Sequence, residues 1–334
     1  MPCPHCTIAG QNITFSLNDT ILNFIHKHLT QRDFPMNIHD HRLTTHEQGA
    51  RELVDFLEAM DLTTDVEFQI NNYDWLPLAD FKDYQDASWV DDLLFEPYIR
   101  MHFQPIIKPD GEIFAYEMLS RFVDKDGNRI FPDVMFPAAK MRGRTFALDR
   151  ICRIHAVRQV KRLLPNQRAF INFIPTAIYS PEFCLKTTTD LAHALEIDSK
   201  RFVFEVVETE QVKDTDHLQS ILKYYQDHGF QYALDDVGSG YNTLNFLKEL
   251  KPPYIKLDLA FVRDVDTDVE KQRVAKEILN LRDAFGAMAL AEGVETIEEF
   301  HWLKQAGFDL FQGYLFGKPE SEPLIKSSID IVAL

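Results

Sequence analysis

Short apolar runs alternate with amphipathic stretches from about residue 101 to the C-terminus. The apolar runs that we predict to be strands cover residues 102–107, 113–119, 169–173, 201–207, 231–234, 254–257, 287–291 and 310–314. Between most of them apolar residues recur at helical spacing, as they do at 148–164, 216–228, 271–285 and 297–306. Strands that alternate with helices in this way are typical of a largely parallel sheet.

The first two predicted strands are joined by a turn instead of a helix. Lys108, Pro109, Asp110 and Gly111 lie between them, and Pro, Asp and Gly favour tight turns. We therefore predict a hairpin, in which these two strands are antiparallel.

The first 90 residues have a different pattern. Residues 46–60 place apolar side chains at helical spacing, and residues 66–70 alternate as a strand does. Residues 87–100 read as a connecting helix. We therefore predict a small N-terminal α+β module over residues 1–90, with a regulatory or dimerisation role, and a larger catalytic domain over residues 91–334.

The charge balance excludes one class of function. Lys and Arg total 35 against 52 Asp and Glu, which gives a formal net charge of -17. Because non-specific nucleic-acid binding needs clustered basic residues, we expect no DNA or RNA duplex as a partner.

No apolar run approaches the ~20 residues that span a bilayer, and the first residues lack the pattern of a signal peptide. We therefore expect a cytoplasmic protein without a membrane segment.

The four cysteines are too few for a disulfide framework. Cys3 and Cys6 have the spacing of half a zinc site, which the early histidines His26, His28, His39 or His41 could complete. The simpler alternative is a reduced terminus without metal, because the second ligand pair lacks a reliable spacing. We expect Cys152 and Cys184 to be packing residues.

A polar side chain ends or follows most of the predicted strands. These residues are Glu117, Asn172, Glu205, Asp235, Asp236, Lys256, Glu292 and Gln312. In an α/β barrel the carboxyl ends of the strands converge on one face, which carries the catalytic residues. Helix capping could explain any one of these carboxylates, but not a whole series in register. We therefore predict that they form one site.

The composition of this set points to a particular kind of metal. Carboxylates and an Asn amide without Cys or His favour Mg²⁺ or Mn²⁺ over Zn²⁺. The adjacent Asp235 and Asp236 could bridge and flank two cations ~3.5–4 Å apart, an arrangement used for in-line displacement at phosphorus. Lys256 could orient the attacking hydroxide or stabilise charge. The larger coordination shell of Ca²⁺ should make that ion inhibitory.

Several motifs resemble those of the EAL family of cyclic di-GMP phosphodiesterases. Residues 103–106 (Phe-Gln-Pro-Ile) and 116–121 (Tyr-Glu-Met-Leu-Ser-Arg) are similar to the opening of the family's domain, with Glu117-Met118-Leu119 in place of its Glu-Ala-Leu. Further family motifs follow in the same order at 205–208, 235–241, 255–258, 291–296 and 312–314. The resemblance covers the chain from about Met101 to the C-terminus.

The resemblance implies a modified (β/α)8 TIM-like barrel with one antiparallel strand, and hydrolysis of cyclic di-GMP to linear pGpG. It assigns one metal to Glu117, Asn172, Glu205 and Asp235. Asp235 would bridge to a second metal, which Asp236 would also bind. Glu292, counted among the ligands, and Lys256 would lie beside the attacking water.

The same resemblance assigns the remaining functional residues. Gln104 and Arg121 resemble substrate contacts, and Gln312 resembles the family's glutamine at the site. Glu208 resembles the Glu that steadies the loop after the paired aspartates, and the resemblance places that loop near a homodimer contact. We therefore expect a homodimer whose loop responds to the N-terminal module.

Three positions depart from the family pattern. Met118 replaces Ala, Val207 replaces the usual Thr, and Ile174 stands where Ser is common. Because residues alternate faces along a strand, we expect Met118 to point away from Glu117 into packing. The alternative to an active enzyme is a catalytically silent cyclic di-GMP receptor or protein-interaction domain. The chain has no Gly-Gly-Asp-Glu-Phe motif, so we infer no synthesis of the dinucleotide.

Overall fold

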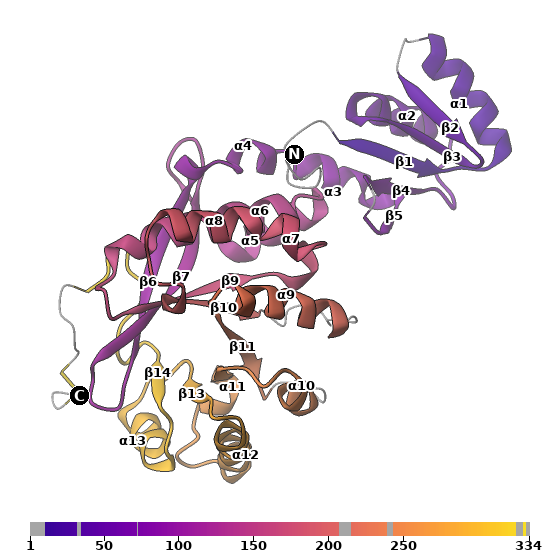
Figure 1. Ribbon diagram of the computed structural model, residues 1–334. Helices are drawn as coiled ribbons and strands as arrows, with labels where there is room; N and C mark the ends of the chain where they lie inside the picture. Colours follow the sequence, from indigo (N-terminus) through magenta and orange to yellow (C-terminus); the bar gives the residue numbers. More distant parts are fainter. Residues whose placement is uncertain are drawn as a thin grey trace. The chain divides into compact units, whose positions relative to one another are not determined.

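The computed structural model describes residues 11–31, 35–71, 73–206, 215–238, 243–324 and 330–331. Contacts divide the chain into two compact units (Figure 1). One is drawn from Met1–Phe95 and Ile130–Leu148, and the other from Glu96–Arg129 and Asp149–Leu334. The segment Ile130–Leu148 thus folds with the N-terminal residues, although the larger unit precedes and follows it in sequence.

The first unit contains an antiparallel sheet with the order β2-β3-β1-β4-β5. Its strands are β1 (Asn12–Ser16), β2 (Met36–His39), β3 (Arg42–His46), β4 (Glu67–Ile70) and β5 (Trp75–Pro77). Its helices are α1 (Asp19–Gln31), α2 (Glu47–Ala59), η2 (Leu78–Asp80), α3 (Phe81–Asp86), α4 (Trp89–Leu93) and α5 (Pro132–Met141). The predicted helix at 46–60 and strand at 66–70 are present as α2 and β4.

The core of this unit is built where α2 meets the sheet. Ala50, Leu53 and Leu57 recur at helical spacing on α2 and are buried. They belong to the same buried cluster as Phe15 and Phe68, whose rings lie 6.4 Å apart. The helical periodicity of residues 46–60 therefore predicted which face of α2 is buried.

The prediction of one connecting helix over residues 87–100 is wrong. Helix α4 ends at Leu93, a 3-10 turn follows at Glu96–Tyr98 (η3), and strand β6 begins at Ile99. Pro97 has no backbone N–H to donate within a helix, and it disfavours a helical conformation in the residue before it. An α-helix therefore cannot continue from α4 into the strand.

The second unit is a closed eight-stranded barrel. The strand order is β6-β14-β13-β12-β11-β10-β9-β7, and β6 also pairs with β7, which closes the ring. The strands are β6 (Ile99–Ile107), β7 (Ile113–Val123), β9 (Arg168–Phe173), β10 (Phe202–Val206), β11 (Gln231–Val237), β12 (Tyr254–Leu257), β13 (Met288–Ala291) and β14 (Leu310–Gln312). A two-residue strand, β8 (Arg129–Ile130), lies beside β7.

Strand β6 is antiparallel to both of its neighbours, and the remaining barrel pairs are parallel. The predicted hairpin and the modified TIM-like barrel are therefore confirmed. Helix α6 (Thr145–Gln159) begins in the first unit and continues into the second. The other helices of the second unit are η4 (Val160–Arg162), η5 (Pro175–Ala177), α7 (Pro181–Cys184), α8 (Lys186–Ala194), η6 (Ser199–Arg201), α9 (Thr215–Asp227), α10 (Thr243–Leu250), α11 (Leu259–Val262), α12 (Val269–Phe285) and α13 (Ile297–Ala306).

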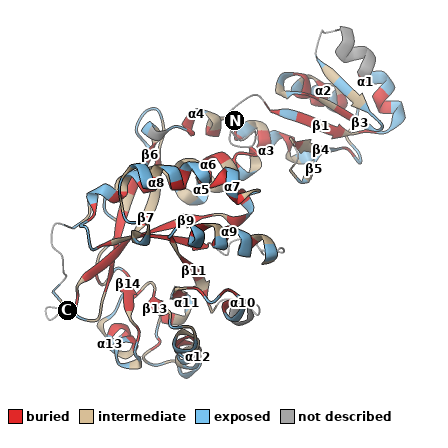
Figure 2. Cartoon of the chain, in the orientation of Figure 1, coloured by how far each residue is buried: buried red, intermediate tan, exposed pale blue. Residues whose placement is uncertain are grey.

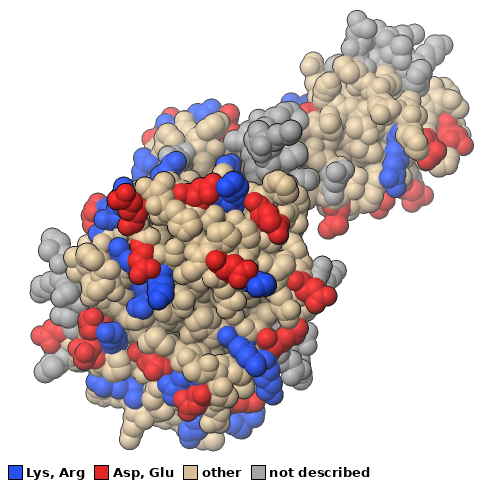
Figure 3. All heavy atoms as spheres, viewed as in Figure 1, with Lys and Arg blue, Asp and Glu red and all other residues tan. Residues whose placement is uncertain are grey.

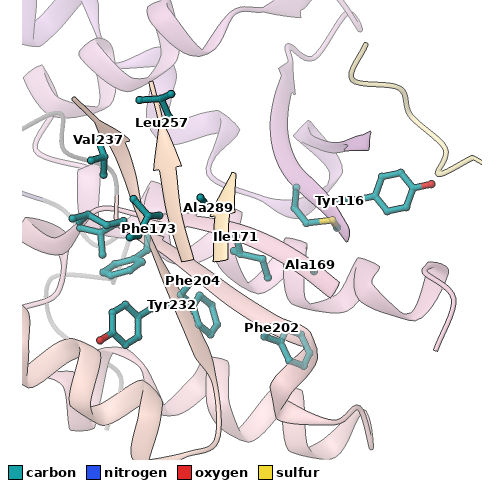
Figure 4. Close-up of a cluster of buried hydrophobic side chains, with 14 of the residues drawn as sticks. Tyr116, Ala169, Ile171, Phe173, Phe202, Phe204, Tyr232, Val237, Leu257 and Ala289 are labelled. Atoms are coloured by element: carbon teal, nitrogen blue, oxygen red, sulfur yellow. The ribbon is translucent and has the colours of Figure 1, made fainter. Parts of the chain in front are cut away.

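Two apolar layers hold the barrel together. The outer layer lies between strands and helices, and Figure 4 shows part of it, including Phe173, Phe204 and Tyr232. The inner layer fills one end of the barrel with residues from all eight strands: Ile106, Phe114, Ala115, Phe170, Val203, Ala233, Tyr254, Leu290 and Leu310. The strands are accordingly buried along most of their length (Figure 2). The barrel is thus packed on both surfaces of its sheet.

Several sequence predictions concern individual residues of these layers. Met118 is buried in the outer layer, as its predicted face requires. Cys152 and Cys184 are buried and form no disulfide within the described residues, which agrees with their predicted packing role, and burial raises the pKa of Cys152 to about 12. Cys3 and Cys6 lie outside the described residues. No helix in the described part of the chain is long and apolar enough to cross a membrane.

Candidate functional site

The polar end of the barrel interior follows from the alternation of faces along each strand. Positions i and i+2 of a strand share a face, and on seven of the strands one inner apolar residue has a polar residue two positions farther on. The pairs are Ala115 and Glu117, Phe170 and Asn172, Val203 and Glu205, Ala233 and Asp235, Tyr254 and Lys256, Leu290 and Glu292, and Leu310 and Gln312. In β6, which runs the other way, Gln104 precedes Ile106 by the same interval.

Lys256 lies at the centre of this polar group. Its Nζ is 2.6 Å from Oε1 of Glu205, 2.8 Å from Oδ1 of Asp235 and 2.5 Å from Oε1 of Glu292. The Lys256 side chain is 1% exposed and that of Glu205 is 0% exposed. Burial alone would lower the pKa of Lys256, but attraction to the surrounding carboxylates outweighs it and raises that pKa well above the usual value.

Two of the carboxylates around Lys256 also have raised pKa values, which disfavours their charged form. Burial raises the pKa of Glu205 and that of Glu292 well above the usual range, and neighbouring carboxylates add to the effect. One ammonium group therefore faces more negative charge than it can neutralise. Such a group of carboxylates stays ionised only if further cations are present.

Glu117 belongs to a row of amide contacts on the other side of the site. Asn172 Nδ2 donates to Glu117 Oε1 at 2.9 Å, and Gln312 Nε2 donates to Glu117 Oε2 at 2.6 Å. Gln312 Nε2 also donates to Gln104 Oε1 at 3.1 Å. Gln104 and Glu117 are direct register partners on β6 and β7. The antiparallel strand therefore delivers its glutamine to the same end of the barrel as the parallel strands.

Asp235 and Asp236 are adjacent in sequence, yet both contribute to one cluster. Carboxylate oxygens of Asp235, Asp236 and Glu292 all lie within 4.8 Å of one another. The pairing of β11 with β12 shifts register between Leu234 and Val237, and Asp236 has a φ of 51°. This irregularity breaks the alternation of faces, which would otherwise point neighbouring residues to opposite sides. Burial and the charge of Asp235 raise the pKa of Asp236 to about 6.

Divalent cations fit this set of residues. Glu205 Oε2 is buried and has no hydrogen-bond partner among the described residues. Oε1 of the same carboxylate is close to Lys256 Nζ but lacks hydrogen-bond geometry. An unpartnered buried carboxylate oxygen is costly, and hard cations such as Mg²⁺ prefer carboxylate and amide oxygens. The acidic cluster is therefore a candidate metal site.

The remaining predicted residues lie at the rim or outside the described chain. Arg121 is half-buried, and its Nη1 donates to the backbone oxygen of Ser120 at 3.0 Å. Burial lowers the pKa of Arg121, and the charge of Glu117 partly opposes this effect. Glu208 and Val207 lie outside the described residues. On the face drawn in Figure 3, acidic and basic side chains are interspersed.

The sequence reasoning missed two residues near the site. The negative charge of Asp258 helps to raise the pKa of Asp236, and its position at the end of the 255–258 motif could have indicated it. Tyr314 follows Gln312 by two residues and is 55% exposed, with Lys318 Nζ 5.2 Å from its ring centroid. The sequence signal that could have indicated Tyr314 was an aromatic residue at the end of the 312–314 motif.

Comparison with known proteins relates the barrel to one family. The model of the EAL domain matches residues 90–319. The probable cyclic di-GMP phosphodiesterase PdeG of Escherichia coli (strain K12) is 32% identical over 225 residues, which cover 65% of this chain and 44% of that protein. The cyclic di-GMP phosphodiesterase PdeF of the same strain is 29% identical, over 68% of this chain and 30% of that protein. The chain thus spans less than half the length of these relatives.

Two solved structures extend the comparison to the fold. A standalone versatile EAL protein from Vibrio cholerae O395, in its c-di-GMP bound form, has a TM-score of 0.60 and 35% sequence identity. The aligned region covers 67% of this chain and 93% of the Vibrio cholerae chain. An EAL domain protein from Listeria monocytogenes EGD-e has a TM-score of 0.62 at 23% identity, over 71% of this chain and 94% of its own. The second similarity supports the fold alone.

Proposed function

Because the chain belongs to the EAL domain family, we propose that it hydrolyses cyclic di-GMP to linear pGpG with two divalent cations, Mg²⁺ or Mn²⁺. The observation that carries this proposal is the convergence of the carboxylates, the amides and a central lysine at one end of the barrel. Relatives named as cyclic di-GMP phosphodiesterases and a relative solved with c-di-GMP bound support the choice of substrate.

The proposed metal ligands form two overlapping sets that share Asp235. Glu117, Asn172, Glu205 and Asp235 would hold one cation, and Asp235 together with Asp236 would hold the other. Glu292 is close enough to both aspartates to complete the set. When bound, such cations lower the pKa of a water molecule and stabilise negative charge on a phosphoryl group.

Lys256 and Glu292 would act on the attacking water. The ammonium of Lys256 is held between Glu205, Asp235 and Glu292, so it presents positive charge at a fixed place. A positive charge placed there in advance stabilises a hydroxide nucleophile without reorganisation during the reaction. Oε1 of Glu292 lies 2.5 Å from Lys256 Nζ, so its carboxylate is placed to accept a proton from a water molecule beside the ammonium.

The amide row and the rim would position the dinucleotide. Gln104 and Gln312 contact each other beside Glu117, and their amides can hydrogen-bond phosphate or base. The guanidinium of Arg121 supplies positive charge for a phosphate. These contacts orient the scissile bond in line with the nucleophile, which is how binding lowers the barrier to displacement.

Product analysis with a matched pair of variants tests the proposal. We expect the full chain to convert cyclic di-GMP to pGpG with Mg²⁺ or Mn²⁺ and to lose turnover in EDTA. Asp235→Asn should abolish turnover, whereas Asp309→Asn, which alters an aspartate next to the amino end of β14, should retain it. Binding of cyclic di-GMP without product would instead identify a catalytically silent receptor.

We further propose that the protein acts in the cytoplasm as a homodimer whose activity the N-terminal module controls. A regulated phosphodiesterase needs a connection between the module and the barrel sequence. The segment Ile130–Leu148, which folds with the N-terminal residues, offers such a connection. Measuring the oligomeric state by light scattering, with and without cyclic di-GMP, tests the dimer directly.

A further inference from the structure

The short helix α11 touches the two segments that carry the clustered carboxylates. It begins directly after β12 and the loop residue Asp258, whose side chain accepts from Ala260 N at 2.5 Å. Val262 at its other end is fully buried in the outer layer of the barrel. Contacts therefore fix both ends of the helix, which begins three residues after Lys256 in the sequence.

One side of α11 contacts the backbone that follows Asp235 and Asp236. Gly238 has a φ of +116°, and a Cβ there would lie 2.7 Å from Cδ2 of Phe261. Asp258 N also donates to the backbone oxygen of Val237 at 3.1 Å. The Phe261 ring thus rests against bare backbone two residues beyond Asp236.

The other side of α11 contacts the backbone that follows Glu292. Gly293 has a φ of +66°, and a Cβ there would lie 2.7 Å from Cβ of Leu259. Glu292 N donates to the backbone oxygen of Leu257 at 3.2 Å, and Arg263 Nη2 donates to that of Gly293 at 3.4 Å. Contacts this close leave no space for a side chain at Gly293.

From these contacts we infer that α11 is a spacer that sets the separation between the Asp235–Asp236 pair and Glu292, with Leu259 and Phe261 as positioning residues. The spacer lies between two glycine contacts, and the carboxylates next to those glycines lie within 4.8 Å of one another. Adding volume at either contact moves a carboxylate relative to the others. This inference rests on the proposed function, because the separation matters only if cations bind there.

The glycines of the chain supply a matched pair of variants. Gly286 has a φ of +69°, close to that of Gly293, but a Cβ at Gly286 would meet nothing within 4 Å. Gly293→Ala and Gly286→Ala therefore impose similar backbone strain. They differ in that Gly293→Ala alone adds a collision with α11.

Direct Mn²⁺ binding to the full chain, measured by calorimetry without substrate, tests the spacer. We expect Gly293→Ala to weaken Mn²⁺ binding at least tenfold and Gly286→Ala to change it less than twofold. Equal loss of Mn²⁺ affinity in both variants would attribute the effect to backbone strain and overturn the spacer. If the wild-type chain binds no Mn²⁺, the proposed metal-dependent function itself fails.

A second pair of variants covers the case in which Gly293→Ala does not fold. Phe261 and Phe285 are both partly buried against the outer layer, but Phe285 precedes β13 and so lies at the opposite end of the barrel. We expect Phe261→Ala to weaken Mn²⁺ binding at least fivefold, and Phe285→Ala to leave it within twofold. Equal Mn²⁺ affinities for these two variants would overturn the role of Phe261.

Discussion

Lys256 Nζ lies 2.6 Å from Oε1 of Glu205, a carboxylate that has no solvent exposure. Removing the ammonium leaves buried carboxylates without a compensating charge. Lys256→Met should therefore destabilise the metal-free protein by about 3–5 kcal/mol. Excess Mn²⁺ should recover part of this loss, because cations can neutralise the same carboxylates. Urea unfolding in EDTA and in Mn²⁺ measures both effects.

The control for this prediction is a lysine on the surface. Lys223 pairs with Asp227 at 3.2 Å, but its side chain is 74% exposed. Lys223→Met should change the free energy of unfolding by less than about 1 kcal/mol, with or without Mn²⁺. Equal effects of the two substitutions would contradict the structural importance of the buried cluster.

Carboxylates that act on one transition state should give non-additive losses. Glu117→Ala and Asp235→Asn should each lower kcat by orders of magnitude, and the double variant should lose little more than either. Full activity of Asp235→Asn at saturating Mg²⁺ would exclude the proposed mechanism. Excess Ca²⁺ should inhibit the wild-type chain, because its longer bonds and larger coordination shell suit the paired site poorly.

Met118 should affect stability and not catalysis. It is buried in the outer layer, on the opposite face of β7 from Glu117. Met118→Ala restores the signature of the family but leaves a cavity, which should lower the free energy of unfolding by about 2–5 kcal/mol. Met101→Ala, at a buried position of the same layer, is the matched control. A tenfold rise in kcat with unchanged melting would mean that Met118 reaches the site.

The metal-free protein should lose stability as the pH rises through about 6. Burial and Asp235 raise the pKa of Asp236 to about 6 from an ordinary value of 3.8. Asp236 therefore contributes stability below pH 4, and this contribution is lost as the pH rises through 6. Burial of Glu205 and Glu292 shifts their pKa values in the same direction. Asp236→Asn should flatten the profile of melting temperature against pH in EDTA, and an unchanged profile would contradict the assignment.

Much of the site could be predicted from the sequence because it depends on local alternation. A polar residue two positions after an apolar one lies on the same face of a strand, so Val203 and Glu205 reveal the interior without any distant contact. Asp236 does not obey this rule, since its position depends on a register shift in β11. The contacts of α11 with Gly238 and Gly293 were also hidden, because they join segments far apart in sequence.

The division of the chain into units depends on contacts that no local pattern reveals. Arg142 Nη2 lies 2.7 Å from Glu47 Oε2 and 2.7 Å from Asp91 Oδ2, and its guanidinium lies over the ring of Tyr84. The Arg142 side chain is 4% exposed. These contacts join Ile130–Leu148 to residues 51 to 95 positions earlier in the sequence. Sequence periodicity carries no information about such pairs.

The same ion pairs provide a test of control by the N-terminal module. Deleting residues 1–86 would remove Glu47 and Tyr84 together, so its effect on activity would mix regulation with loss of packing around Arg142. Arg142→Ala keeps the chain complete. It should destabilise the first unit by about 3–5 kcal/mol, because Glu47 loses its buried partner and Asp91 keeps only Arg144. Arg51→Ala, which removes a half-exposed partner of Glu47, should cost less than about 1 kcal/mol.

Kinetics of these two variants then separate a regulatory module from a passive one. If the first unit controls the site, Arg142→Ala should change kcat or the Mn²⁺ concentration needed for half-maximal activity at least threefold at a temperature where the barrel is folded. Arg51→Ala should leave both quantities unchanged. Circular dichroism at the assay temperature confirms that the barrel remains folded. The ion pairs of Arg142 lie within the first unit. Identical kinetics for wild type and Arg142→Ala would therefore mean that disrupting this unit does not affect the catalytic carboxylates. The regulatory proposal would then fail.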